Sequence, residues 1–412
     1  MDSRQRLTAY FEQIAKFSLP GKGITRLAFS KEYWQALDYV KGLMREAGLA
    51  IRQDQFGNII GRREGTNPAA PAVMCGSHID SVPNGGNYDG VLGVLGAVEC
   101  INRMNERGYK NYNSIDIPVY ICEESSRFGT ATLGSRAMCG ELSIAEMKKL
   151  GDKSGRSLYA ILLECGLAPD ELTSIIDKNN IKACLEMHIE QGVVLENMHK
   201  SIGIVTGIAA PTRLKVQIHG RADHSGATPM NMRRDALCAA AEIILAVERY
   251  AKESEKPAVG TVGIVNAQPN VMNVIPGNAE IGIDIRSIHA DAKDSIVHAV
   301  RRFIEQTAQK RQLAIKIDTI ADEQPVMLSP SVTNLIENSC QKLHKSYNIM
   351  PSGAGHDTMH LAKFAPSGMV FIPCRNGISH NPAEYAAMDD ILNGVDVLYD
   401  TLCRIASKEY QS

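Results

Sequence analysis

Residues 72–93 read AVMCGSHIDSVPNGGNYDGVLG, and this stretch indicates the fold class. The apolar run at 72–77 is typical of a buried β-strand, the glycine-rich part is typical of a turn, and a helical pattern extends from Gly90 to Arg107. A strand that passes through a short turn into a helix is the repeating unit of a parallel sheet covered by helices. We therefore predict an α/β fold with a mostly parallel sheet.

Further strands of the same kind lie along the chain. Apolar runs at 117–122, 183–189 and 369–374 alternate with helical patterns, for example at 330–347. Near-continuous apolar strands between helices indicate a sheet that is covered on both faces.

The segment from about 212 to 319 has a different pattern. It starts with the alternating strand RLKVQIHG, and its strands and helices follow the order βαββαβ, as in ferredoxin-like domains. The α/β pattern resumes afterwards, and 412 residues exceed the size at which one hydrophobic core keeps growing. We predict an inserted domain at 212–324 between the two parts of a catalytic domain, 1–211 and 325–412.

The composition gives no reason to expect a nucleic acid or a membrane as partner. The chain is 44% hydrophobic and 22% charged, and its formal net charge of −2 provides no basic surface for such a partner. The most apolar longer run, 236–247, is short and contains Glu242, as expected of a buried helix. The expected partners are small molecules.

The N-terminus and the cysteines indicate a cytoplasmic protein. Residues 1–21 have no uninterrupted apolar segment behind a basic end, so they do not resemble a secretory signal peptide. The ten cysteines form no C-x-x-C pair, and most lie in apolar runs such as VYIC and MVFIPC. We expect them to be free thiols in a reducing compartment.

The predicted strands lead to residues that can bind metals. In an open parallel sheet, ligands bind at the carboxyl ends of the strands, where side chains become free. We expect the side chains that follow the four apolar runs to gather there. They are His78 and Asp80, Glu123 and Glu124, His188, and His380.

Asp89 lies in the glycine-rich turn immediately before the first predicted helix. It is either the N-cap of that helix or a carboxylate that bridges two cations, and its position near His78 favours the second role. The pair Glu123 and Glu124 is either a solvated acidic pair or a metal ligand beside a proton acceptor. Asp80, two residues after His78, has the position of a carboxylate that orients the imidazole.

Three imidazoles and two or three carboxylates suit divalent zinc, manganese, cobalt or nickel. One zinc ion needs fewer ligands, so their number indicates two ions. Two such ions can lower the pKa of a shared water to about 7 and polarise a carbonyl oxygen. The predicted reaction class is hydrolysis.

Seven ordered motifs resemble the amidase, hydantoin-utilisation and carbamoylase branch of the M20 metallopeptidases. They are SHIDSVPNGGNYDG, EESSRFGTATLGSR, EMHIEQG, GRADHSGATPM, NVIPGNAEIGIDIRS, SGAGHDTMHLA and GISHNPAEY. The resemblance covers about residues 50 to 390. The branch includes N-carbamoyl-L-amino acid hydrolases, allantoate amidohydrolases and one type of β-ureidopropionase. M20 peptidases outside it usually have an aspartate where this chain has His188.

The resemblance implies a role for each residue of the site. Glu123 would be the general base, and Asp80 would support His78. Asp89 would bridge two divalent metal ions. The full set of implied metal ligands is His78, Asp89, Glu124, His188 and His380.

The resemblance also implies that the inserted domain is a lid and a homodimer interface. It would supply His224, Asn273 and Arg286 to the substrate, with His224 as hydrogen-bond donor to an oxyanion and Arg286 as clamp for a carboxylate. In family members the counterpart of His224 reaches the active site of the partner subunit. Dimerisation would then be a condition of activity.

Further substrate contacts are expected at Gln191, Arg213, Gly377 and Ser379. Arg213 is equally well explained as an exposed strand residue, and Glu384 is expected to support the loop of His380. Residues His356 and Asp357 are expected to form a structural turn under the site.

Ser125 departs from the family pattern, which usually has glycine at this position. If the position required a positive φ, serine would cost about 1 kcal/mol.

The predicted function is hydrolysis of the carbamoyl C–N bond of N-carbamoyl-L-amino acids, releasing the amino acid, carbon dioxide and ammonia. The alternatives are an allantoate amidohydrolase that acts in purine breakdown, an aminopeptidase or dipeptidase of the same fold, and a binding protein without catalysis. His188 and Arg286 disfavour the peptidase, and an intact Glu123 disfavours the binding protein.

Overall fold

The structure of the chain is a computed structural model that describes residues 1–177 and 179–410. Its backbone forms two compact units. The first consists of Met1–Thr206, Leu328–Met350 and Gly355–Ser412, and the second of Gly207–Met327 and Pro351–Ala354. Position 178 and positions 411–412 of the predicted catalytic segments lie outside the described residues.

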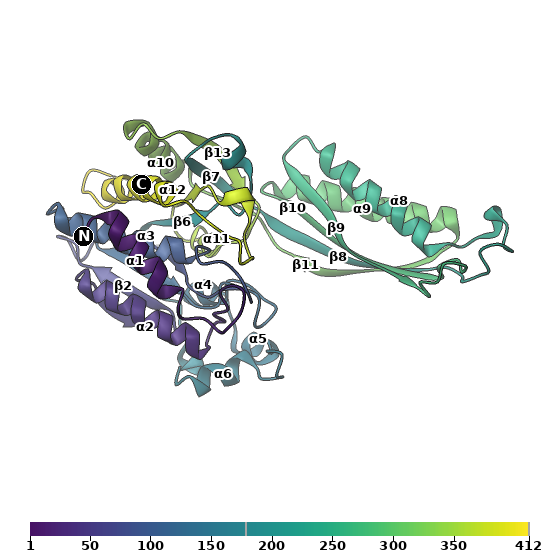
Figure 1. The fold of residues 1–412 in the computed structure, drawn as a ribbon, viewed down its shortest axis with the longest axis horizontal. Helices are drawn as coiled ribbons and strands as arrows, with labels where there is room; N and C mark the ends of the chain where they lie inside the picture. Colours follow the sequence, from purple (N-terminus) through teal and green to yellow (C-terminus); the bar gives the residue numbers. More distant parts are fainter. Residues whose placement is uncertain (178, 411–412) are drawn as a thin grey trace. The chain divides into compact units, whose positions relative to one another are not determined.

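The first unit contains a large sheet with helices around it (Figure 1). The helices are α1 (Ser3–Ile14), α2 (Lys31–Glu46), α3 (Val91–Glu106), α4 (Leu133–Met138), α5 (Ile144–Lys149), α6 (Leu158–Glu164), α7 (Val194–Asn197), α10 (Pro330–Lys342), α11 (Thr358–Leu361) and α12 (Met388–Ile405). Short 3-10 turns are η1 (Pro169–Glu171) and η3 (Arg375–Gly377). The strands of the large sheet are β1 (Ala50–Gln53), β2 (Ile59–Arg63), β3 (Ala72–Cys75), β4 (Ser77–His78), β5 (Ile115–Tyr120), β6 (Ile181–Ile189), β7 (Ile202–Ile208), β12 (Val326–Met327), β13 (Tyr347–Ser352) and β14 (Ser367–Ile372). Of these, β12 and the last two residues of β7 and of β13 belong to the second unit.

The sheet has the order β1-β2-β5-β3-β6-β14-β7-β12, with β4 beside β5 and β13 beside β7. Its centre is parallel, because β5, β3, β6 and β14 run in one direction and β4 is parallel to β5. Antiparallel pairs occur on both sides of this centre. The prediction of an α/β fold with a parallel sheet is therefore confirmed for the central strands.

The apolar runs bury both faces of the parallel strands. On β3, Val73 and Cys75 belong to the core that contains the apolar side chains of α3 and α12, whereas Met74 belongs to a separate core with Met138 and Leu361. All four residues of β3 and all six of β5 and of β14 are buried. Near-continuous apolar strands therefore fix a sheet between two layers of helices.

The second unit contains an antiparallel sheet and two long helices. In chain order its elements are β8 (Ala210–His219), η2 (Met230–Met232), α8 (Ala236–Lys252), β9 (Ala258–Gln268), β10 (Asn278–Ser287), α9 (Ala290–Arg311) and β11 (Ala314–Asp322). The strand order is β11-β8-β10-β9, which confirms the βαββαβ pattern. Alternate residues of β10, such as Ile281, Ile283 and Ile285, form a core with the helices, and polar residues such as Glu280, Asp284 and Arg286 lie on the other face of this strand.

Helix α8 starts later than the sequence pattern indicates. The pattern predicts a helix from Met230, but the helix begins at Ala236. The side chain of Asp235 accepts a hydrogen bond from the amide of Cys238 and so caps the helix. None of the described helices is long and apolar enough to cross a membrane.

Candidate active site

Parallel strands place the predicted ligands at one edge of the sheet of the first unit. His78 ends β4, His188 lies near the end of β6, and Glu124 follows β5. Asp89 lies in the turn before α3, and His380 follows η3. These five residues form two groups that could each hold a metal ion, one of His78, Asp89 and His188 and one of Asp89, Glu124 and His380.

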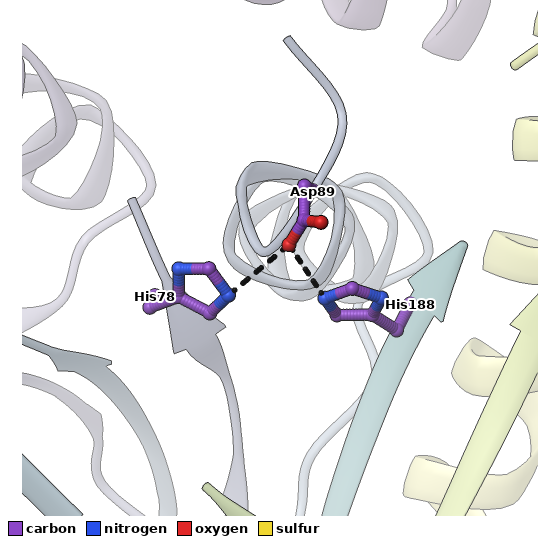
Figure 2. Close-up of side chains that lie close together, drawn as sticks. All are labelled: His78, Asp89 and His188. Atoms are coloured by element: carbon purple, nitrogen blue, oxygen red, sulfur yellow. Dashed lines mark ion pairs between the residues drawn. The ribbon is translucent and has the colours of Figure 1, made fainter. Parts of the chain in front are cut away.

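Asp89 belongs to both groups and presents one carboxylate oxygen to each. Its Oδ1 lies 3.4 Å from His78 Nε2 and 3.2 Å from His188 Nε2, and Figure 2 shows both imidazoles pointing at this oxygen. Its Oδ2 lies 3.3 Å from His380 Nε2, and the same nitrogen lies 3.4 Å from Glu124 Oε1. A carboxylate with this arrangement is suited to bridge two cations.

The turn before α3 requires glycine. Gly90 has a φ of 66°, and a Cβ at this position would lie 2.3 Å from Nε2 of His78. The N-cap of α3 is Gly90, and no side chain caps this helix. The alternative role of Asp89 as N-cap is therefore wrong, because the turn directs its carboxylate to the histidines.

Hydrogen bonds fix the orientation of the two buried imidazoles. His78 Nδ1 lies 3.1 Å from the carbonyl oxygen of Asp80, and His188 Nδ1 lies 2.9 Å from that of Ile189. A carbonyl can only accept, so each Nδ1 carries the proton and each Nε2 has a free lone pair. The amide of Gly90 donates to His188 Nε2 at 3.0 Å, which agrees with this tautomer.

Asp80 holds the two glutamates by its side chain. Its Oδ1 accepts a hydrogen bond from the amide of Glu123 at 3.2 Å, and its Oδ2 accepts one from the amide of Glu124 at 3.1 Å. The distance from Oδ1 to His78 Nδ1 is 3.7 Å. Asp80 therefore contacts His78 mainly through its backbone carbonyl, and its carboxylate fixes the chain after β5.

Burial changes the acidity of the two glutamates. Burial, together with the charges of Glu124 and Asp357, raises the pKa of Glu123 well above its ordinary value, although the nearby His78 opposes this shift. Burial and the charge of Asp89 raise the pKa of Glu124 to about 7. Glu123 Oε2 lies 3.7 Å from His78 Nε2. A carboxyl group with a raised pKa beside the candidate metal groups is suited to accept and return a proton.

Asp89 carries a negative charge at the centre of the site. Burial opposes the ionisation of Asp89, but the neighbouring His188, His380 and His78 hold its pKa well below the ordinary value. The hydrogen bond between His380 and Asp89 raises the pKa of His380 to about 9. A metal ion that binds His380 therefore has to displace a proton from its imidazole.

Gln191, Ser379 and Glu384 surround Asp89. Gln191 Nε2 donates to Asp89 Oδ2 at 2.6 Å, and Ser379 Oγ lies 2.8 Å from the same oxygen and 3.0 Å from Glu384 Oε2. Glu384 Oε1 accepts hydrogen bonds from the amides of Tyr88 and Asp89. Glu384 thus holds the turn of Asp89 as well as the segment of Ser379.

Gly377 packs closely on the segment that follows Gln191. It has a φ of 63°, and a Cβ there would lie 2.5 Å from the side chain of Val193. Close packing is therefore sufficient to explain the glycine, and its expected contact with substrate stays a prediction.

The remaining predicted substrate residues lie in the second unit. His224 Nδ1 accepts hydrogen bonds from the amides of Gly226 and Ala227, and the neighbouring Ser225 donates its amide to the carbonyl of Asn273. Arg213 and Arg286 both donate to the carboxylate of Asp284. Their roles toward a substrate stay predictions.

Two buried residues next to the site were not singled out from the sequence, Glu186 and Cys122. Glu186 accepts hydrogen bonds from the hydroxyls of Ser77 and Thr358 and so links the strand end of His78 to α11. It lies two residues before His188, and this spacing on a strand was the available signal. Cys122 has a φ of 65° directly before Glu123, and no sequence signal marks it.

His356 and Asp357 were expected to form a structural turn under the site. His356 is buried, and its ring packs edge to face on His188 with centroids 4.7 Å apart. Asp357 accepts a hydrogen bond from Ser135. The pair lies beneath His188, and neither candidate metal group includes it.

Ser125 has no unusual backbone. It is exposed and does not adopt a positive φ. Serine therefore causes no backbone strain at this position.

Comparison with known proteins identifies the family. Residues 74–404 match peptidase family M20/M25/M40. The chain is 41% identical over 406 residues to an N-carbamoyl-L-amino-acid amidohydrolase from Pseudomonas sp. (strain NS671), with 98% of each chain covered. It is 40% identical to a ureidoglycolate hydrolase from Arabidopsis thaliana, with 96% of this chain and 85% of the relative covered.

Two further comparisons agree with this. An allantoate amidohydrolase from Escherichia coli (strain K12) is 34% identical, with 94% of each chain covered. The crystal structure of an amidase of the hydantoinase/carbamoylase family from Burkholderia multivorans is 31% identical, covers 99% of each chain and superposes with a TM-score of 0.94. The chain therefore belongs to peptidase family M20/M25/M40 and is a hydrolase of the amidohydrolase type, which acts on carbon–nitrogen bonds other than peptide bonds.

Proposed function

We propose that this chain hydrolyses the carbamoyl C–N bond of N-carbamoyl-L-amino acids with two divalent metal ions. The observation that carries the proposal is the carboxylate of Asp89, which is shared between two groups of ligands. The amidohydrolase relatives named for N-carbamoyl-L-amino acids support the choice of substrate.

The donor atoms fit first-row divalent ions. Ligand atoms at 2.0–2.2 Å from a tetrahedral ion are roughly 3.3–3.6 Å apart. The Nε2 atoms of His78 and His188 lie 3.4 and 3.2 Å from Asp89 Oδ1, close to this range. Both nitrogens have free lone pairs because their Nδ1 atoms face carbonyl oxygens. His78, His188 and Asp89 would hold one ion, and Asp89, Glu124 and His380 would hold the other.

The residues of the chain have separate tasks in the reaction. Divalent ions, when bound, would lower the pKa of the attacking water and polarise the substrate carbonyl. Glu123 takes the proton of the attacking water at its carboxylate and later delivers this proton to the leaving nitrogen. Asp80 keeps Glu123 in place by accepting its amide hydrogen bond. The carbamate that is released decomposes to carbon dioxide and ammonia.

The second unit would bind substrate and another subunit. We propose that His224, Asn273 and Arg286 contact the substrate, and that this unit acts as a lid and homodimer interface. His224 Nδ1 accepts two amide hydrogen bonds, so Nε2 carries the proton and is available as donor to an oxyanion. Light scattering measures the oligomeric state, and a monomer with full activity would refute the dimer. The ten free cysteines support a cytoplasmic location.

A second candidate substrate is another small ureido acid. The ureidoglycolate hydrolase from Arabidopsis thaliana is nearly as similar as the carbamoyl hydrolase, and the allantoate amidohydrolase follows at lower identity. All of these candidate substrates are small carboxylates, which Arg286 could bind.

An ammonia-release assay distinguishes the candidates. The enzyme is loaded in turn with Zn²⁺, Mn²⁺, Co²⁺ and Ni²⁺ and assayed on N-carbamoyl-L-methionine, N-carbamoyl-β-alanine, allantoate and ureidoglycolate. We expect the highest kcat/KM for N-carbamoyl-L-methionine. A higher value for allantoate or ureidoglycolate would select the second candidate, and inactivity on all four with every metal would reject both.

The role of Glu123 can be tested separately. We expect Glu123→Gln to lower kcat by roughly 10²- to 10⁴-fold, the usual contribution of a general base. The metal content measured by atomic absorption should stay at the wild-type level, because Glu123 belongs to neither ligand group. Unchanged turnover would refute the mechanism.

A further inference from the structure

The sheet face of the second unit that is turned away from its core holds an acidic residue between two arginines. Asp284 on β10 lies directly opposite Arg213 on β8 in the sheet register. Its Oδ2 accepts a hydrogen bond from Arg213 Nε at 2.9 Å. Its two oxygens also accept hydrogen bonds from Nε and Nη2 of Arg286, at 2.7 and 3.1 Å. One carboxylate therefore holds both arginines that were predicted to bind substrate.

The contacts of Arg286 leave room for one further carboxylate. A guanidinium group carries five N–H donors. Two of them are used by Asp284, and one on Nη1 is donated to the carbonyl of Gly353 at 3.0 Å. The two that remain are the number that a bidentate carboxylate takes. About a quarter of the Arg286 side chain, 27%, is exposed, so these donors are held in a partly buried place.

The net charge of the cluster also favours the binding of one carboxylate. Arg213 and Arg286 carry two positive charges, and Asp284 carries one negative charge, so the net charge is +1. Burial raises the pKa of Asp284, but Arg286 and Arg213 lower it below its ordinary value, and the carboxylate is ionised at neutral pH. A single negative charge on a bound molecule would therefore neutralise the cluster.

From these contacts we infer that Asp284 determines specificity, because it positions Arg286 and matches the cluster to substrates with a single carboxylate. The inference rests on the proposed function, in which Arg286 binds the carboxylate of a ureido acid. Asp284 itself acts through the two arginines and is a positioning residue.

If Asp284 only stabilised the sheet, removal of another ion pair on the same face would have a similar effect on activity. The pair Glu280 and Lys215 lies on the same face of the same two strands, with Lys215 Nζ 2.8 Å from Glu280 Oε2. Cross-strand ion pairs of this kind stabilise a sheet modestly wherever they occur. Glu280→Gln is therefore the matched control, because it removes a comparable pair without touching either arginine.

The test compares two substrates with Asp284→Asn. N-carbamoyl-L-alanine carries one carboxylate, and N-carbamoyl-L-aspartate carries two. The variant loses the fixed position of Arg286 and gains one unit of positive charge. We expect KM for N-carbamoyl-L-alanine to rise roughly tenfold with kcat nearly unchanged. The ratio of kcat/KM for the aspartate substrate to that for the alanine substrate should rise roughly fivefold.

Arg213→Met gives the opposite change and covers the case in which Asp284→Asn does not fold. The side chain of Arg213 is 48% exposed, so its removal leaves the core intact. Its loss lowers the net charge to zero, and the same ratio should fall severalfold.

The outcomes separate this inference from the proposed function. Wild-type inactivity on every ureido acid would reject the proposed function. An active wild type whose substrate ratio is unchanged in Asp284→Asn, or in Arg213→Met where the first variant does not fold, would overturn the inference alone. So would a change of equal size in Glu280→Gln, because the effect would then come from the sheet in general.

Discussion

Asp89 and Asp284 each lie between basic side chains, in two units of very different construction. Asp89 is 8% exposed and faces the Nε2 atoms of three histidines. The side chain of Asp284 is 29% exposed and faces two arginines. Imidazole nitrogens have a lone pair when they are not protonated, whereas a guanidinium group has none and stays charged. The first arrangement can therefore accept a cation, and the second can only accept an anion.

The position on the two sheets explains the difference in burial. Asp89 lies at the end of a parallel sheet that is covered on both faces, so it is buried, and its neighbours His78 and His188 are fixed by buried strands. Asp284 lies on the open face of an antiparallel sheet, where solvent screens each ion pair. The comparison predicts that equal substitutions at the two carboxylates have unequal effects.

The largest effect is expected for Asp89→Asn. The substitution removes one negative charge from both ligand groups. Mutation of a residue that only supports a metal ligand usually lowers metal affinity roughly 10- to 100-fold, and loss of the shared ligand Asp89 should lower it by more. Metal content after dialysis and kcat on N-carbamoyl-L-methionine are the measurements, and both should drop to near background. Asp284→Asn is the matched control and should keep its metal. Equal metal loss in both variants would contradict the comparison.

Asp80→Asn should have the next largest effect. The asparagine retains one acceptor oxygen, so one of the amides of Glu123 and Glu124 loses its partner. We expect kcat to fall by roughly 10- to 100-fold, as is usual for residues that support a metal site. The metal content should fall much less than in Asp89→Asn. Circular dichroism checks the fold, because Asp80 is fully buried, and complete loss of metal from a folded variant would contradict this division of roles.

Arg286→Lys tests the anion-binding side of the comparison. Lysine has no planar fork, so it cannot keep the paired hydrogen bonds to Asp284 and bind a substrate carboxylate at the same time. We expect KM for N-carbamoyl-L-methionine to rise roughly 10- to 100-fold, with the metal content unchanged. Lys215→Met on the same sheet face serves as control. A fall in kcat without any change in KM would show that Arg286 does not bind the ground-state carboxylate.

The sequence predicts the buried part of the molecule well. The runs at 72–77 and 117–122 are apolar because both faces of their strands are covered. The residue at which each apolar run stops also indicates where the strand ends. Residues at such ends gather because parallel strands share one edge. The grouping of His78, His188 and Asp89 in space was therefore foreseeable from their positions after or within the strands.

Other features depend on contacts that no local pattern reveals. Asp284 reads as one more polar residue of an alternating strand, and only the register with Arg213 shows that it joins two arginines. The carboxylate of Asp80 was expected to orient His78, yet its hydrogen bonds are to the amides of Glu123 and Glu124. Backbone amides have no signature in the sequence, so this partner could not be identified before the structure.

The smallest effect is expected for Ser125→Gly, which introduces the glycine of the motif that the sequence EESSRF resembles. Ser125 is exposed in the turn after Glu124, does not adopt a positive φ, and accepts a hydrogen bond from the amide of Gly129 through its own carbonyl. Glycine keeps that hydrogen bond and gains freedom only in the unfolded chain, so the free energy of unfolding should fall by about 0.4–1 kcal/mol. Thermal unfolding and kcat are the measurements, with Ser126→Gly in the same turn as control. We expect kcat to stay within about twofold of the wild type, because no side-chain contact of Ser125 reaches the ligand groups and neither glycine variant removes a group from them. A kcat that rises severalfold in Ser125→Gly and not in Ser126→Gly would show that the residue at position 125 affects the position of Glu124. The candidate metal site would then depend on a solvent-exposed turn as well as on buried strands.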